Sequence, residues 1–180
     1  MEKADLTQYI DAARGFGATD AKIIDPETVV TAPWVRWKCQ FGCPGFGGSH
    51  CCPPNTPDDQ ETRRLLDSYQ RAILFHLEAP REPGRGKMCQ EYFAKLIELE
   101  GTVFKHGHYK ALVMLAGPCR WCAECAKAQG NPCTFGAKAR PSLEACGIDV
   151  FQTARNNGLF IETLREKTET QNLYSLLLVD

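Results

Sequence analysis

The sequence lacks long hydrophobic runs and an excess of charge of either sign. Its most apolar segments, residues 111–116 and 173–179, are far shorter than the roughly 20 residues of a membrane-spanning helix. The first 15 residues contain no apolar stretch typical of a secretion signal. The 21 basic and 22 acidic residues are scattered and leave a formal net charge of −1. We therefore expect a cytoplasmic protein that binds neither nucleic acid nor membranes.

Motifs of common catalytic sites are also missing. The sequence contains no glycine-rich phosphate loop after a strand, no G-x-S-x-G and no H-E-x-x-H. No residue pattern identifies a catalytic acid, base or nucleophile. The sequence therefore leaves it open whether the protein is an enzyme.

Cysteine, in contrast, is abundant, with ten residues in a chain of 180. Disulfide-dense proteins are typically secreted domains of fewer than about 80 residues that cannot build a core. This chain is longer, and its 43% of hydrophobic residues suffice for one core without cross-links. We therefore expect a single domain over residues 1–180 whose cysteines bind metal.

Helical and strand patterns alternate along the chain. Apolar residues at helical spacing predict helices at residues 5–14, 58–69, 88–104 and 148–156. Short apolar runs predict strands at residues 21–24, 71–77, 111–116 and 174–179. Residues 29–37, interrupted by Pro33, suggest an extended segment. Ser142 is the expected N-cap either of a short helix over 143–146 or of one that runs on through 148–156. The fold expected is α/β or mixed α+β: a single sheet of about four or five strands with flanking helices and two cysteine-rich metal-binding loops.

The more regular cysteine cluster is C-R-W-C-A-E-C, with a further cysteine after seven residues. Its members are Cys119, Cys122, Cys125 and Cys133. Gaps of two residues let the thiolates converge on one centre while backbone N–H groups point at the sulfides of a cubane cluster. Ferredoxins usually have proline after the last cysteine, whereas Thr134 follows here. The cluster therefore predicts an iron–sulfur site with Cys133 as candidate fourth ligand.

The other cluster lies in a stretch rich in glycine and proline. Its members are Cys39, Cys43, Cys51 and Cys52. Adjacent cysteines seldom bind one metal together, so Cys39, Cys43 and Cys52 are the expected ligands, with Cys51 as the spare and the fourth ligand elsewhere. A single cysteine more often packs as an apolar side chain, and of Cys89 and Cys146 the latter is the better metal candidate.

Three explanations compete for the clusters: iron–sulfur, zinc and disulfide. The triple spacing favours [4Fe–4S], zinc sites more often pair two C-x-x-C knuckles, and a reducing compartment disfavours disulfides. The leading hypothesis is two [4Fe–4S] clusters that pass single electrons to a redox partner protein. The alternatives are an enzyme that offers an open iron to a small substrate, and a zinc-ordered interaction module.

Side chains around the clusters have expected roles too. Basic residues that flank both clusters either offset the negative charge of a thiolate-bound centre or are solvated surface charges: Arg36, Lys38, Arg120, Lys127, Lys138 and Arg140. Aromatic residues are candidates to shield the clusters from water: Trp34, Trp37, Phe41, Phe46 and Trp121. His106 and His108 are expected in a solvated turn, whereas His50, inside the first loop, is a minor candidate ligand or hydrogen-bond donor.

Four stretches of sequence resemble a family of predicted metal-binding proteins, DUF2284. They are C-Q-F-G-C-P-G-F-G-G-S-H-C-C-P-P at 39–54, A-G-P-C-R-W-C-A-E-C at 116–125, P-C at 132–133 and A-R-P-S-L-E-A-C-G-I-D-V at 139–150. The resemblance implies metal binding, with iron–sulfur clusters, and an anaerobic setting, but no reaction. In the family the residue before Cys-Pro-Pro need not be cysteine, which favours Cys52 over Cys51. Cys146 lies inside the last motif, which strengthens it as a candidate.

Overall fold

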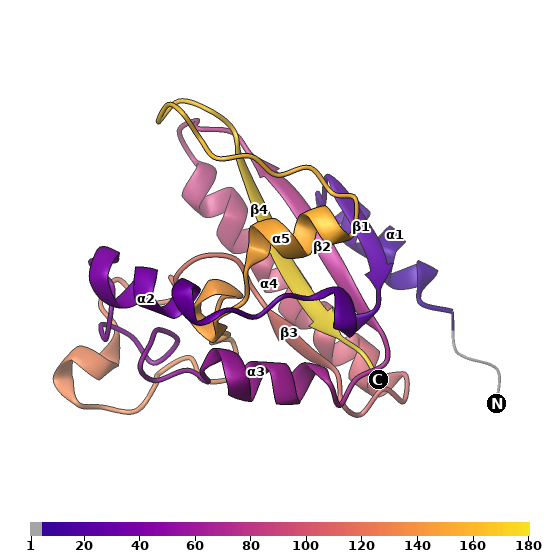
Figure 1. Ribbon diagram of the computed structural model, residues 1–180, viewed down its shortest axis with the longest axis horizontal. Coiled ribbons are helices and arrows are strands. Elements are labelled where there is room, and N and C mark those ends of the chain that lie inside the picture. The colour runs from indigo at the N-terminus through magenta and orange to yellow at the C-terminus, as the bar shows by residue number, and fades with distance from the viewer. Residues whose placement is uncertain (1–4) are drawn as a thin grey trace.

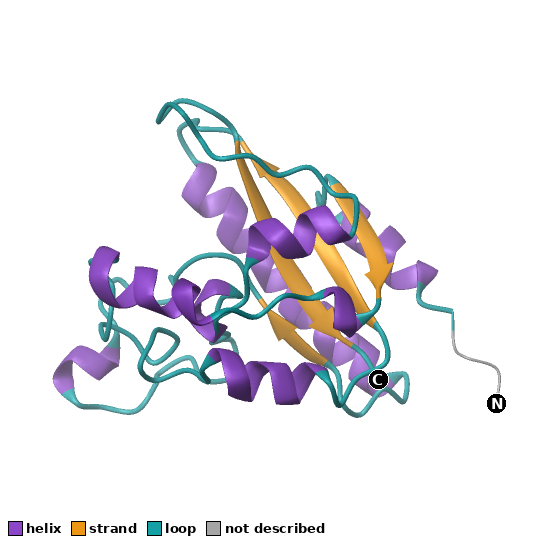
Figure 2. Ribbon diagram, viewed as in Figure 1, coloured by secondary structure: helices purple, strands orange, loops and turns teal. Residues whose placement is uncertain are grey.

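The computed structural model describes residues 5–180, which form one antiparallel sheet with helices on both of its faces (Figures 1 and 2). The strands lie in the order β1 (Asp20–Ile24), β2 (Ala72–Ala79), β4 (Gln171–Leu178) and β3 (Leu112–Met114). Each neighbouring pair is antiparallel. The expected single sheet with flanking helices is confirmed, in its mixed α+β form with four strands.

One face of the sheet is covered by α1 (Thr7–Gly15) and α4 (Arg85–Lys105). Successive side chains of a strand point to opposite faces, so alternate residues of β2, Ile73, Phe75 and Leu77, face these two helices. All three are almost fully buried. This packing holds α4, the longest helix, against the sheet next to the end of β3.

The other face is covered by α3 (Asp59–Leu66), α5 (Val150–Asn156) and the short 3-10 turns η1 (Pro26–Thr28) and η3 (Glu144–Cys146). Helix α3 begins with a capping box in which Asp58 accepts from the Glu61 N–H at 2.8 Å. Helix α5 begins where the Asp149 carboxylate accepts from the Gln152 N–H at 3.0 Å. These caps fix both helices beside the turn that contains Cys146.

One local prediction was wrong, and one that left two alternatives open is decided. Residues 29–37 were expected to be extended, but α2 (Pro33–Gly42) begins at Pro33. Proline is tolerated there because the N–H groups of the first helical turn have no partner within the helix, so the missing N–H of Pro33 costs no hydrogen bond. Of the two helices that Ser142 was expected to cap, the short one is present: the Ser142 hydroxyl accepts from the Ala145 N–H at 3.1 Å at the start of η3. The helix proper starts later, because Gly147 has a positive φ and interrupts it.

The two cysteine-rich segments lie side by side at one end of the molecule (Figure 1). The first begins in the last turn of α2, and the second leaves the sheet after β3, includes η2 (Ala126–Gln129) and returns at Ser142. Leu115 and Ser142 form a parallel bridge that closes this second loop. Within residues 5–180, no helix is long and apolar enough to cross a membrane.

Candidate metal centre

The two cysteine-rich loops meet around a cavity of about 200 Å³. They are joined by His50, whose ring nitrogen donates to the Asn131 carbonyl at 2.9 Å across 81 residues of sequence. The cavity is lined by six cysteines, Cys51, Cys52, Cys119, Cys122, Cys125 and Cys133. Thiols that lie far apart in the sequence therefore converge on one place.

The four cysteines of the regular cluster lie close together. Desolvation and, after it, the nearby thiols of Cys125, Cys119 and Cys133 raise the pKa of Cys122. Thiols raise one another's pKa because adjacent thiolates repel. A bound metal would supply the positive charge that lets all of them ionise together.

Cys51 joins this group instead of the first one. Its buried thiol forms a hydrogen bond with the Cys119 sulfur, which raises the pKa of Cys51 and lowers that of Cys119. The Trp121 N–H also donates to the Cys119 sulfur. Cys133 and Cys52 are the other thiols that act on Cys51. The residue expected to be spare in the first cluster thus faces the second.

A second group of thiols consists of Cys39, Cys43 and Cys52. Burial first, and then the thiol of Cys43, raises the pKa of Cys39; Cys52 contributes in the same direction. Cys39 lies in the last turn of α2, and the Cys43 N–H donates to its carbonyl at 3.3 Å. Cys52 also lines the cavity of the regular cluster, so it lies between the two groups of thiols, whereas Cys51 pairs with Cys119.

The donor atoms in these two groups are sulfur, the ligand that zinc sites and iron–sulfur clusters share. Within residues 5–180, no set of three or more Cys, His, Asp or Glu side chains has the geometry of a ready single-ion site. The chemistry of the donors nevertheless fits a thiolate-bound metal centre, because six cysteines line the cavity and His50 is the other common metal-binding side chain in that lining.

A comparison with known protein families matches residues 22–179 to a family described as predicted metal-binding protein, DUF2284. The chain belongs to the DUF2284 family. The match includes both cysteine loops and confirms the resemblance read from the motifs. Neither the curated proteins nor the solved structures contain a significant match.

Arg36 anchors the first cysteine loop of this DUF2284 protein. From α2, its guanidinium donates to the Thr56 hydroxyl at 2.7 Å and to the Pro57 carbonyl at 3.0 Å. It also donates to the Ala145 carbonyl of η3, which accepts from the Thr56 hydroxyl at 2.6 Å. The sequence suggested only a charge near the cluster, whereas the structure gives Arg36 a role in joining three segments.

Cys146 and Cys89 lie outside both thiol groups. Cys146 is 3% exposed and packs in the core beneath the sheet, where burial raises its pKa to about 12. Cys89 is partly buried on α4; burial raises its pKa, and Arg85 and Arg120 act in the opposite direction. Cys146, which its motif favoured as a metal ligand, therefore lies next to the site in the hydrophobic core.

Glu144 is the functional candidate that the sequence reasoning missed. Its buried carboxylate accepts hydrogen bonds from the Ser142 hydroxyl and the Gly117 backbone, and burial raises its pKa. One oxygen, Oε2, has no partner among the described residues. The side chain lines a cavity of about 590 Å³ together with Cys39 and Cys43. No pattern in the sequence distinguishes it from a surface glutamate.

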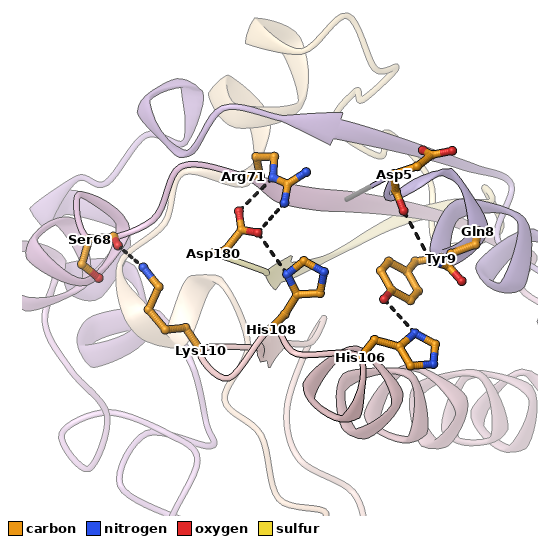
Figure 3. Close-up of polar contacts among 9 residues, drawn as sticks. All are labelled: Asp5, Gln8, Tyr9, Ser68, Arg71, His106, His108, Lys110 and Asp180. Carbon is orange, nitrogen blue, oxygen red and sulfur yellow. Dashed lines mark hydrogen bonds and ion pairs between the residues drawn. The ribbon is translucent and has the colours of Figure 1, made fainter. Parts of the chain in front are cut away.

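The two histidines expected in a solvated turn are in fact held by distant partners (Figure 3). The ring of His106 bonds to the Tyr9 hydroxyl at 2.9 Å. His108 bonds at 3.0 Å to Asp180, which is also bound by Arg71. His106 is exposed in the expected turn, whereas His108 is partly buried because its carboxylate partner comes from a segment 72 residues away.

Proposed function

We propose that the protein carries two [4Fe–4S] clusters and transfers single electrons to a redox partner protein. The observation that supports this most is the presence of two groups of thiols, one around Cys39 and one around Cys119, that meet at the adjacent residues Cys51 and Cys52. The clusters would supply reversible one-electron chemistry. Cys39, Cys43 and Cys52 would hold the first, and the regular cluster from Cys119 onward the second.

Residues near the thiolates tune such a centre. Cys119 accepts hydrogen bonds from the Cys51 thiol and the Trp121 N–H, and donors of this kind stabilise negative charge on sulfur. The rings of Trp121 and Phe135 line the same cavity and limit the access of water. Of the aromatic residues expected as shields, Trp121 is the one in this position.

The proximity of the two groups favours electron transfer between them. Cys51 and Cys52 are joined by one peptide bond; Cys51 pairs with Cys119 of one group, and Cys52 acts on Cys39 of the other. Two centres bound there would be separated by only a few covalent bonds. An electron could therefore enter at one centre and leave from the other.

Exposed aromatic side chains next to the first group support a protein partner. On α2, Trp34, Trp37 and Phe41 are 46%, 65% and 72% exposed, and the Lys38 ammonium lies 5.2 Å from the Trp34 ring centroid. Aromatic residues are enriched in protein interfaces. They flank Cys39 on the same helix, so a partner docked there would be close to the first centre.

A second candidate function is an enzyme with an open iron at the first centre. It is favoured because only three cysteines of the described chain form that group, which leaves one position for a substrate. The buried Glu144 carboxylate, beside Cys39 and Cys43, would then lie near the reacting ligand.

Anaerobic purification with iron and sulfide analysis tests the proposal. We expect a brown protein with about eight irons and eight sulfides per chain. Cys52→Ser should reduce both counts by about half, because the first centre loses a ligand, whereas the matched variant Cys51→Ser should keep them. Colourless protein that contains zinc and no sulfide would refute both redox functions and favour a zinc-ordered module.

Electron paramagnetic resonance of the reduced protein separates the two candidates. A closed carrier should give the same spectrum with and without small ligands such as cyanide. A shift confined to the signal that Cys52→Ser removes would instead favour the open-site enzyme.

A further inference from the structure

A separate cavity of about 240 Å³ adjoins the cysteine cavity and is strongly basic. The two share Pro118, Cys119 and Trp121 in their linings, so they lie on either side of the same short segment. Four arginines line the basic cavity, Arg81, Arg85, Arg120 and Arg140. No aspartate or glutamate is among its lining residues.

Three of these arginines have no carboxylate partner within residues 5–180. Arg140 is the exception, because it forms an ion pair with Glu100, which is outside the cavity lining. Arg85 and Arg120 lie close enough to Cys89, on the cavity wall, to act on its thiol. The positive charge of the cavity is therefore largely uncompensated by the protein.

Arg85 carries a donor that the protein does not use. Its Nε atom is buried and has no hydrogen-bond partner among the described residues, while a terminal nitrogen of the same side chain donates to Gln171. A buried donor without an acceptor destabilises the folded protein. An oxyanion in the cavity would supply that acceptor.

The first turn of α4 adds to the same potential. The helix begins after Gly84, which has a φ of +90° and provides no side-chain cap. Its residues Arg85, Gly86 and Cys89 line the cavity. The uncapped N–H groups and the helix dipole both favour an anion at this position.

We infer that this cavity binds a small organic anion through a carboxylate or phosphate group, held by Arg85 and Arg120. Apolar side chains, Phe93, Leu115 and Leu173, line the same cavity and match the carbon part of such a ligand. The volume suits a molecule smaller than most drug-sized ligands.

The anion site lies next to Cys119, so a bound anion would affect the redox chemistry of the second centre. This consequence rests on the proposed function. A bound anion adds negative charge beside a ligand of the second centre. Negative charge there disfavours the added electron and lowers the reduction potential. The ligand would therefore regulate the potential of that centre.

Isothermal titration calorimetry on the anaerobically purified full chain tests the binding. Succinate and inorganic phosphate are the probes, and neutral succinamide is their control. We expect saturable binding of at least one anion and none of succinamide; phosphate alone would assign a phosphate group, and succinate alone a carboxylate. Arg85→Met and Arg120→Ala should each weaken binding about tenfold or more.

Arg64→Ala, which removes the same charge from the exposed surface of α3, should bind like the wild type. Circular dichroism and thermal unfolding confirm that each variant is folded. Absence of anion binding, or equal affinity of the Arg85 and Arg120 variants and the wild type, would overturn the inference. A brown protein that binds no anion would refute the anion site and leave the proposed clusters standing. A colourless zinc protein that binds an anion would refute the proposed clusters and leave the anion site standing.

Discussion

Gly147 occupies a position where any side chain is expected to destabilise the fold strongly. It ends η3 with a φ of +78°, a conformation that costs an L-residue about 1–2 kcal/mol. A Cβ there would also lie 2.8 Å from the Asp59 Cβ and 2.9 Å from the Asp59 Cα. Such overpacking typically costs about 1–3 kcal/mol. Gly147→Ala should therefore lower the free energy of unfolding by about 2–5 kcal/mol.

The same substitution should weaken the metal site. Gly147 follows the turn whose Ala145 carbonyl accepts from Arg36 and Thr56, and its own carbonyl accepts from the Ala32 N–H at 2.8 Å. A shift of this turn away from α3 would loosen the anchor of the first cysteine loop. We therefore expect a lower iron content as well as lower stability.

Urea unfolding followed by circular dichroism measures the effect, with Gly158→Ala as the matched control. Gly158 has a similar φ of +69°, but the nearest atom to its added Cβ is the flexible Lys22 Nζ at 3.8 Å. The control should lose only about 1–2 kcal/mol. Equal losses in the two variants would show that the contact with Asp59 does not matter and would refute the reasoning.

Three further substitutions test other parts of the structure. Cys146→Ala should retain the full metal content and lose about 1–2 kcal/mol of stability, because Cys146 packs in the core; loss of iron would identify it as a ligand after all. The hydrogen bond from Arg71 lowers the pKa of Asp180 from its usual 3.8, so this carboxylate stabilises the fold above that pH. Asp180→Asn should therefore lower the free energy of unfolding by about 1 kcal/mol at pH 7, allowing for a third of the side chain being exposed. The difference in stability between variant and wild type should vanish as the pH falls through the lowered pKa. A difference that stays constant with pH in urea unfolding would contradict this. Arg36→Met should lower both iron content and the free energy of unfolding, the latter by about 2–3 kcal/mol, since the Thr56 hydroxyl and three carbonyls lose a charged donor; unchanged iron analysis would exclude the anchoring role.

Local patterns in the sequence were enough to predict the helices and strands whose apolar residues recur at a regular spacing. The spacing around residues 88–104 predicted α4, and short apolar runs predicted β2, β3 and β4, because each signal depends only on neighbouring residues. The cysteine spacings and motifs identified the family in the same way. These features are properties of short segments, and no knowledge of the chain's path is needed to read them.

Only the tertiary structure decided which distant groups meet. The pairing of Cys51 with Cys119, while Cys52 acts on Cys39, depends on how the first loop lies against the second. The burial of Glu144 and the gathering of arginines beside Cys119 depend on the course of the chain after β3. Contacts across 80 or more residues are set by sheet order and helix packing, which local spacing does not encode.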